Sequence, residues 1–268
     1  MRRTSLWLAA AAVLVSGAAS ASSITIGGQL GNLNGGVNCG TGSHSTYLGS
    51  SVVEFNFDGI NGSTAYGPCP GTTPDAGYAN FGAIPTGPYT LPSGFGTITF
   101  THNIASGTSG GDIVRGRLEG QTGDPWADNT PYLVIPGIGQ NLNNKLTLSL
   151  TGLASGANYF GMYFGSVDTY NNVKFTLSDG HVINLDGTTI ANALSAVASG
   201  GQFTTNSNVY VDFFAVGATI STIQFSSSTR ALEVDNFAFG LSPVPAPGAF
   251  ALFGLGLLGL GATRRRMR

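Results

Sequence analysis

Short stretches in which apolar and polar residues alternate recur between residues 52 and 239, and they constrain the fold more than any other feature of the chain. In residues 145–151, three leucines occupy alternate positions, and Thr or Ser occupies the positions between them. A period of two is typical of β-strands, because successive side chains of a strand point to opposite faces of its sheet. Strands are also predicted at residues 52–57, 97–100, 159–164, 173–177, 181–185, 209–216, 222–225 and 232–239.

Residues 188–198 are the one stretch whose pattern favours a helix. Ile190, Leu194 and Val197 stand at helical spacing, and Thr188 is placed to cap the helix. Gly accounts for 41 of the 268 residues and charged residues for 9%. This composition disfavours further long helices, because Gly destabilises a helix and a surface helix needs a charged face.

Ten or more strands with so little helix favour two packed antiparallel sheets. We therefore predict a single all-β domain over residues 22–242, a jelly-roll-like antiparallel β-sandwich. Residues 28–50 and 61–92 are expected to form long loops, because Gly, Ser, Asn and Pro dominate them.

The first 21 residues have the pattern of a secretory signal peptide. Arg2 and Arg3 form a positive start, residues 6–19 are an apolar run, and residues 19–21 read Ala-Ser-Ala, a typical cleavage site. One alternative is an N-terminal membrane anchor, which the short, alanine-rich run disfavours. Another is twin-arginine export, for which the arginine pair is the one indication. We expect ordinary secretion with removal of residues 1–21.

Residues 243–268 combine a proline-rich element at 243–247, an apolar stretch of 15 residues at 248–262 and four arginines. A stable transmembrane helix needs about 20 apolar residues. Each of the four glycines between residues 254 and 261 destabilises a helix by about 1 kcal/mol relative to Ala. The arginines favour a cytoplasmic end. We predict a short, weak transmembrane helix with a proline hinge outside the membrane.

This order of elements resembles the PEP-CTERM sorting signal of exosortase substrates. Two groups of residues carry the resemblance, a sorting motif and a membrane stop signal. They are Val244, Pro245, Ala246 and Pro247 for the motif and Arg264, Arg265, Arg266 and Arg268 for the stop signal. Ala246 stands where the family usually has Glu. The alternative is a permanent single-pass anchor with a basic cytoplasmic end.

The resemblance implies transient anchoring in the inner membrane, cleavage by an exosortase-like enzyme and delivery to the cell surface or extracellular matrix. Residues 125–134, 164–171 and 232–237 also resemble exosortase-dependent surface proteins, although Trp126 replaces a usually smaller residue. For the part of the chain outside the membrane, the resemblance implies a β-rich domain without an assigned activity. It covers about residues 95–268.

Residues 22–246 carry five basic and thirteen acidic residues, so their formal net charge is 5 − 13 = −8. Nucleic-acid binding is disfavoured, because phosphate contacts require a basic patch. Cys39 and Cys69 both lie in this acidic part, and an exported chain can oxidise them. A Cys39–Cys69 disulfide is predicted and would contribute about 3 kcal/mol. A reactive Cys–His pair with His44 or a zinc site is less well supported, because no ligand spacing is present.

Acidic side chains provide candidates for a structural calcium site, the one cofactor that the sequence supports. Ca²⁺ prefers six to eight oxygen ligands, and an acidic pair near the last strand of carbohydrate-binding jelly rolls often helps to hold it. The candidate ligands are Glu54, Asp212, Glu233 and Asp235. The alternative for Asp235 and the following Asn is a turn in which both bond to their own backbone.

Aromatic and polar side chains in two loops provide candidate glycan contacts. Sugars bind to aromatic faces and to the oxygens of Asp and Asn. The candidates are Trp126, Asp168, Tyr170 and Asn171. The alternatives are a polar turn after a core strand, for Asp168, Tyr170 and Asn171, and a hydrophobic cap, for Trp126.

We therefore expect a non-enzymatic cell-surface or extracellular-matrix protein associated with exopolysaccharide in a biofilm. The alternative is a carbohydrate-binding module with a structural calcium. A glycoside hydrolase is the third hypothesis, but it needs two carboxyl groups about 5–9 Å apart, and no motif selects such a pair. The three histidines, His44, His102 and His181, have no plausible nucleophile near them in sequence.

Overall fold

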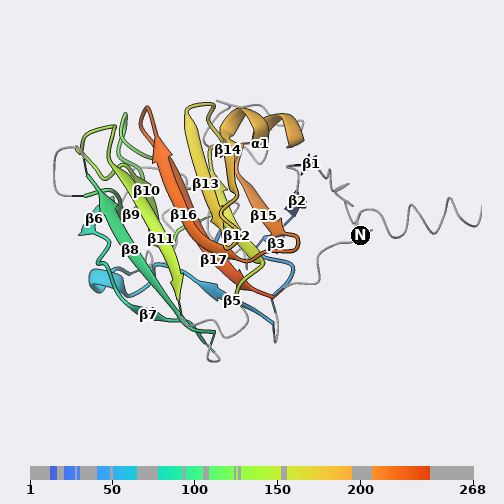
Figure 1. The fold of residues 1–268 in the computed structure, drawn as a ribbon. Coiled ribbons are helices and arrows are strands. Elements are labelled where there is room, and N and C mark those ends of the chain that lie inside the picture. The colour runs from blue at the N-terminus through green and yellow to red at the C-terminus, as the bar shows by residue number, and fades with distance from the viewer. Residues whose placement is uncertain are drawn as a thin grey trace, which may run out of the picture.

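A computed structural model of the chain describes residues 13–16, 21–27, 29–30, 41–48, 51–64, 78–92, 95–104, 109–123, 125, 128–151, 156–194 and 207–241. Within these residues the protein is built almost entirely of antiparallel β-strands (Figure 1). The described helices are α1 (Gly187–Leu194) and the 3₁₀ turn η1 (Ile60–Gly62). The all-β prediction is therefore confirmed.

The strands form a larger sheet of nine strands and a smaller sheet of six. The larger sheet has the order β1 (Val13–Ser16), β2 (Ala21–Gly27), β15 (Val209–Ala215), β12 (Tyr159–Gly165), β17 (Leu232–Gly240), β10 (Tyr132–Ile135), β9 (Asp112–Arg115) and β6 (Ala79–Ala83), with β5 (Val52–Phe55) also paired to β17. The smaller sheet has the order β14 (Val182–Asp186), β13 (Asn171–Leu177), β16 (Ile220–Ser227), β11 (Lys145–Thr151), β8 (Thr97–Asn103) and β7 (Tyr89–Thr90). A separate ribbon pairs β3 (Gln29–Leu30) with β4 (Ser43–His44).

The eight strands from β10 to β17 have the connectivity of a jelly roll. Within the larger sheet their order is β15-β12-β17-β10, and within the smaller sheet it is β14-β13-β16-β11. Successive strands therefore alternate between the sheets, except at the β13–β14 hairpin. This is the strand order of an eight-stranded jelly roll, so the predicted architecture is confirmed, with extra strands added at the edges of both sheets.

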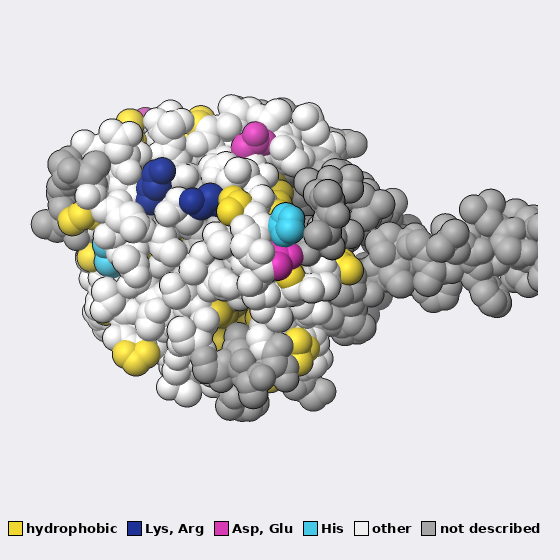
Figure 2. All heavy atoms as spheres, in the orientation of Figure 1, with side chains coloured by type: hydrophobic (Ala, Val, Ile, Leu, Met, Phe, Trp, Pro, Cys, Tyr) yellow, Lys and Arg dark blue, Asp and Glu magenta, His cyan; other side chains and the backbone are white. Residues whose placement is uncertain are grey.

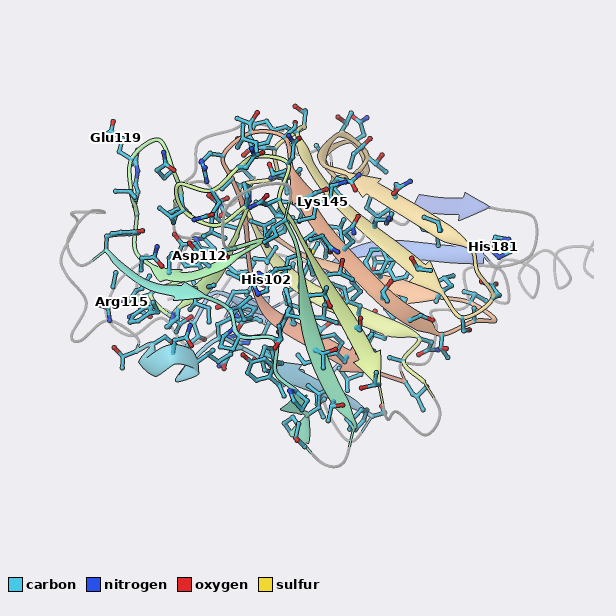
Figure 3. The ribbon with its side chains drawn as sticks, turned by 60° about the vertical axis from the view of Figure 1, so that its left-hand side comes forward. His102, Asp112, Arg115, Glu119, Lys145 and His181 are labelled. Carbon is cyan, nitrogen blue, oxygen red and sulfur yellow. The ribbon has the colours of Figure 1, made fainter. Side chains whose placement is uncertain are left out.

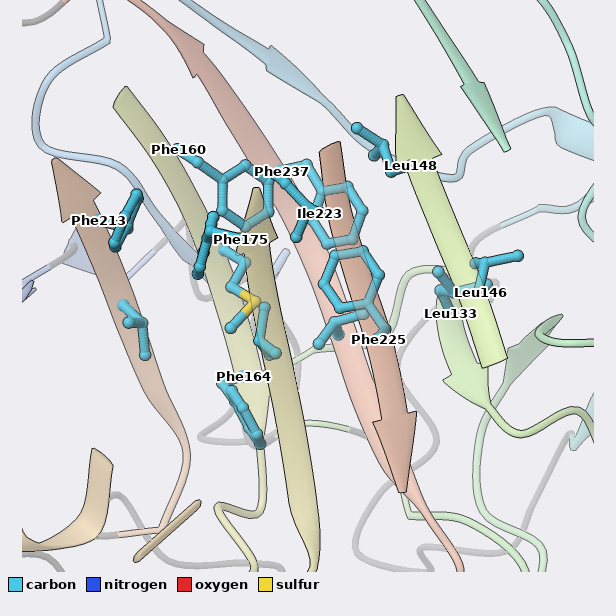
Figure 4. Close-up of a cluster of buried hydrophobic side chains, with 14 of the residues drawn as sticks. Leu133, Leu146, Leu148, Phe160, Phe164, Phe175, Phe213, Ile223, Phe225 and Phe237 are labelled. Carbon is cyan, nitrogen blue, oxygen red and sulfur yellow. The ribbon is translucent and has the colours of Figure 1, made fainter. Parts of the chain in front are cut away.

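An aromatic core fills the space between the two sheets (Figure 4). Phe175 of the smaller sheet stacks on Phe213 of the larger one, with ring centroids 3.8 Å apart. Phe225 stacks on Phe237 in the same way at 5.4 Å. Buried aromatic side chains contribute large apolar areas and favourable ring contacts. The core therefore provides a firm support for the outer face of each sheet, which is the face turned away from the other sheet.

The predicted loops contain short strands, because these segments extend the edges of the jelly roll. β3 and β4 lie within residues 28–50, and β6 and β7 lie within residues 61–92. β6 pairs with β9, and β7 pairs with β8. The prediction of uninterrupted loops was wrong at these four strands.

The helix α1 begins at Gly187 and its cap is Asp186, not the predicted Thr188. The Thr189 backbone N–H donates to Asp186 Oδ1 at 2.6 Å, which is the bond of an N-cap residue. Ile190 is buried in the core, as predicted. Residues 195–198 of the predicted helix lie outside the described part of the chain.

Most of the two predicted processing segments also lies outside the described residues. Within residues 1–21, the structure places Val13–Ser16 as β1, paired with β2 at the edge of the larger sheet. The predicted membrane helix at 248–262 lies outside the described part, as do Cys39 and Cys69, so the helix and the disulfide stay predictions. Among the described helices, none has the length and apolar character needed to cross a membrane.

Candidate functional site

The four most deeply buried acidic side chains of the described residues lie on the outer face of the larger sheet. They are Asp128, Asp212, Glu233 and Asp235, and each is at most 2% exposed. We call them the outer-face acids. Burying a carboxylate is unfavourable unless the charge is neutralised or paired, so their surroundings identify this face as the candidate site.

The pattern of β17 explains why two of these acids face outward. Leu232 and Val234 point into the core, so Glu233 and Asp235 between them point to the outer face. Asn236 then adopts a left-handed conformation with φ of 49°, and the pairing with β12 shifts register at this point. This bulge returns Phe237 to the core side.

Asp128 and Asp235 form a carboxyl pair around Thr130. The Thr130 backbone N–H and hydroxyl group bond to Asp128 Oδ1 at 2.9 and 2.5 Å, and the hydroxyl lies 3.1 Å from Asp235 Oδ2. Burial raises the pKa of both carboxyl groups, and the charge of Asp128 raises that of Asp235 further. Two such groups in contact do not both ionise readily, so in the absence of a cation the pair shares a proton.

The segment from Thr41 to Leu48 covers this carboxyl pair. Asn236 Nδ2 donates to the carbonyl oxygens of Thr41 at 2.6 Å and of Ser43 at 3.2 Å. Gly42 has φ of +72°, and a Cβ there would lie 2.7 Å from the Tyr163 ring and 2.8 Å from Asp128 Oδ2. The segment from Thr41 to Leu48 therefore lies close to the carboxyl pair, and its backbone conformation requires glycine at position 42.

Asp212 belongs to a neighbouring network of hydroxyl groups on the same face. Tyr159 OH donates to Asp212 Oδ1 at 2.6 Å, and Ser45 Oγ lies 2.5 Å from the same phenol oxygen. Burial raises the pKa of Asp212 to about 6, although the bond from Tyr159 lowers it. Tyr47 closes this network, since its ring packs against Tyr159 and Phe214 at 5.4 and 5.3 Å.

Glu54, another predicted calcium ligand, is paired with His44 at the margin of the site. His44 Nδ1 lies 2.9 Å from both carboxylate oxygens of Glu54, and Nε2 lies 2.7 Å from Thr41 Oγ1. Burial lowers the pKa of His44, but the hydrogen bond and charge of Glu54 outweigh it, so the pKa is raised. The pair therefore ties the covering segment to β5.

Glu233 lies beside two of the predicted glycan contacts. Its Oε1 accepts bonds from Thr122 Oγ1 at 3.2 Å and from the Gly123 N–H at 3.1 Å. Burial raises the pKa of Glu233, and the charge of Asp168 adds to the increase. Asp168 Oδ2 in turn accepts a bond from Tyr170 OH at 2.8 Å. Glu233, Asp168 and Tyr170 are therefore neighbours, which we call the glutamate cluster.

The other predicted glycan contacts are placed differently. Asn171 is buried at the start of β13, where its Oδ1 accepts a bond from Ser227 Oγ of β16 at 2.7 Å. Its side chain therefore joins two strands of the smaller sheet. Trp126 lies outside the described residues.

The structure does not bring the four predicted calcium ligands into one group. Glu54 bonds to His44, Asp212 to Tyr159, and Glu233 to Thr122 and Gly123, while Asp235 contacts Asp128. In the part of the chain that the structure describes, no group of three or more His, Cys, Asp or Glu side chains is arranged around a metal position. The sequence missed Asp128 and Thr130, because they lie in a segment without periodic pattern.

The two remaining histidines, His102 and His181 (Figure 3), bond to residues other than the outer-face acids. His102 Nε2 lies 2.7 Å from the Ile84 carbonyl oxygen, and the Gly110 N–H donates to its Nδ1 at 3.0 Å. His181 lies 3.0 Å from Asp179 in the β13–β14 hairpin. Both contacts stabilise local turns and edges of the fold.

Comparison with protein-family models identifies a sorting motif at the C-terminal end of the chain. Residues 243–266 match the model of the PEP-CTERM protein-sorting motif. The chain carries a PEP-CTERM sorting signal. The match includes the predicted sorting motif at 244–247 and three of the four predicted arginines, while Arg268 lies beyond it. Comparisons with curated proteins and with solved structures find no match.

The PEP-CTERM motif has direct consequences for processing and destination. It indicates an exosortase-dependent sorting signal, and therefore processing by an exosortase. It also implies export and a transient passage through the membrane toward the cell surface. These residues lie outside the described part of the chain, so this conclusion rests on their sequence.

Proposed function

We propose that this is a non-enzymatic protein of the cell surface or extracellular matrix, cut from its membrane tail by an exosortase-like enzyme and associated with exopolysaccharide in a biofilm. The observation that carries the proposal is the PEP-CTERM motif at residues 243–266. The signal peptide at residues 1–21 and the disulfide between Cys39 and Cys69 are part of the same proposal, since both fit an exported chain.

The burial of the outer-face acids supports a non-catalytic role. Asp128, Asp212 and Asp235 are at most 2% exposed, and the segment 41–48 lies over them. A catalytic carboxyl group has to reach its substrate within hydrogen-bond distance. In this protein the carboxyl groups whose pKa values are raised by burial instead contact tyrosine, threonine and each other.

The outer face of the smaller sheet supports association with polysaccharide. Adjacent strands present hydroxyl and amide groups in register: Thr147 of β11 faces Thr101 of β8 and Gln224 of β16. Gln224 Nε2 donates to Thr147 Oγ1 at 3.2 Å. Lys174 of β13 stands beside Gln224 in the same row, and few other charged side chains lie on this side of the molecule (Figure 2). We call this surface the hydroxyl face, and an array of mostly uncharged donors and acceptors suits the hydroxyl groups of a polysaccharide.

Two experiments separate the parts of this proposal. Replacement of residues 244–247 by four alanines in the native cells is expected to leave the protein in the membrane fraction, while the wild type is released to the surface or matrix. Equal distribution of both proteins would refute exosortase-dependent sorting through this motif.

Association with polysaccharide is tested by co-sedimentation of the processed protein with matrix polysaccharide from the same cells. Thr101→Glu combined with Thr147→Glu places two negative charges on the hydroxyl face and is expected to reduce binding at least several-fold. Thr188→Glu, at an exposed position on α1, is the matched control and should bind as the wild type does. Failure of the wild type to sediment would refute the association itself.

The glutamate cluster favours a second candidate, a carbohydrate-binding module with a structural calcium. Tyr170 is partly exposed and its phenol is held by Asp168, an arrangement suited to contact with a sugar. Binding on a glycan array with and without calcium, abolished by Tyr170→Ala, would support this candidate. A glycoside hydrolase would instead show polysaccharide turnover that Glu233→Gln abolishes.

A further inference from the structure

Among the residues that the structure describes, none outside the carboxyl pair donates a hydrogen bond to two of its buried oxygen atoms. They are Asp128 Oδ2 and Asp235 Oδ1, and the parent side chains are 2% and 0% exposed. Oxygen atoms in such positions normally have a donor, a water molecule or an ion beside them. The bonds from Thr130 satisfy the opposite oxygen of each carboxyl group, so they do not account for these two atoms.

We propose that Asp128 and Asp235 bind a divalent cation, with Ca²⁺ as the ion that their oxygen chemistry fits. Two carboxylates together neutralise a double positive charge, and hard cations prefer oxygen ligands. The Thr130 hydroxyl lies between the two carboxyl groups. The Thr41 and Ser43 carbonyl oxygens both accept bonds from the side chain of Asn236, the residue after Asp235, so these neutral oxygen atoms also lie near the pair.

The surroundings favour a cation over a salt bridge with the protein's own bases. The charge of Asp58 raises the pKa of both Asp128 and Asp235. The charge of Asp128 also acts on His44, but the ring nitrogens of His44 are bonded to Glu54 and Thr41. Tyr163 covers one side of the site, and its ring lies 2.7 Å from a Cβ built on Gly42. A bound cation would therefore be surrounded by oxygen atoms and by the ring of Tyr163. The segment from Thr41 to Ser43 would lie over it.

This site differs from the calcium ligands predicted from sequence, because it requires Asp128 and Thr130 and excludes Glu54 and Asp212. It also stands independently of the proposed function, since a surface protein, a binding module or an enzyme could each contain it. Its structural consequence is to hold the segment 41–48 against β12 and β17.

The test uses the processed protein purified from its cells, stripped of metal with EDTA. Thermal unfolding is followed during titration with Ca²⁺, and terbium luminescence, sensitised by the neighbouring Tyr163, reports occupancy directly. The variants are Asp128→Asn and Asp235→Asn, which keep the shape of the side chains. Glu119→Gln, at an exposed position in the loop between β9 and β10 (Figure 3), is the control.

The proposal predicts a rise in melting temperature of about 3–6 °C at a calcium concentration ten times the dissociation constant. The rise and the terbium signal should persist in Glu119→Gln and disappear in both Asp variants. Terbium lifetimes in H₂O and D₂O should show few bound water molecules, as expected for a buried ion. This last measurement uses the wild type, so it holds even if a variant fails to fold.

Three results would overturn the proposal. Absence of both the calcium shift and the terbium signal would show that the pair simply shares a proton. Persistence of both in Asp235→Asn would place the ion elsewhere. A terbium ion that keeps most of its water molecules would be bound at the surface.

Discussion

At the scale of single residues, Gly42 has the most demanding position in the candidate site. Its φ of +72° is unfavourable for other residues, and a Cβ would press against Tyr163 and Asp128. Gly42→Ala is expected to lower the free energy of unfolding by about 3 kcal/mol, through backbone strain and overpacking. Gly180→Ala is the matched control, because Gly180 has φ of +86° with open space around it. Urea unfolding should show a loss of about 1 kcal/mol for that control, and equal losses would contradict the close packing of Gly42.

The buried acids also predict how stability depends on pH. Burial raises the pKa of Asp128, Asp212, Glu233 and Asp235, with that of Asp212 reaching about 6. The folded state therefore binds more protons than the unfolded state, in which these groups titrate near pH 4. Their contribution is fully present below about pH 4 and is lost as the pH rises through the folded pKa values. The raised pKa of His44 acts in the same direction.

In EDTA, the protein is expected to be more stable toward urea at pH 5 than at pH 8. Asp212 contributes about 3 kcal/mol over its full titration, of which about half is lost between pH 5 and pH 8, so Asp212→Asn should reduce the pH dependence. A free energy of unfolding that stays constant or rises between these pH values would contradict the burial of ionisable carboxyl groups.

At the scale of elements, strands with strict alternation could be predicted from sequence, and so could β12, although all of its residues are buried. β11 begins and ends where its three leucines predict, and β17 shows its two acids on the outer face as alternation allows. β9 and β10 were missed, because their residues are almost all buried and show no period of two. The carboxyl pair was missed for a related reason, since Asp128 lies in a loop that tertiary contacts alone bring to Asp235.

The N-terminal strands give a prediction at the same scale. Cleavage after Ala21 would remove β1 and leave residues 22–27 of β2, which pair in register with β15. Because β1 is at the edge of the sheet and pairs with β2 through four residues, its removal is expected to leave the fold intact. N-terminal sequencing of the native protein should begin at Ser22, and a chain that starts with signal-peptide residues would contradict cleavage there.

At the scale of the whole molecule, a jelly roll with a hydroxyl face is joined to a PEP-CTERM tail at residues 243–266. The tail could be identified from sequence because its three features are contiguous. The candidate sites could not, because they combine residues from β12, β15, β17 and two loops. The sorting signal of this chain therefore lies in one continuous segment of sequence, whereas its candidate sites form only when the complete domain folds.

The most direct test of this account is the intact mass and C-terminal peptide of the protein isolated from its own cells. Exosortase-dependent processing predicts a chain that ends between residues 243 and 249 and lacks Arg264, Arg265, Arg266 and Arg268. A mature chain that still carries these arginines would show a permanent anchor and contradict the account.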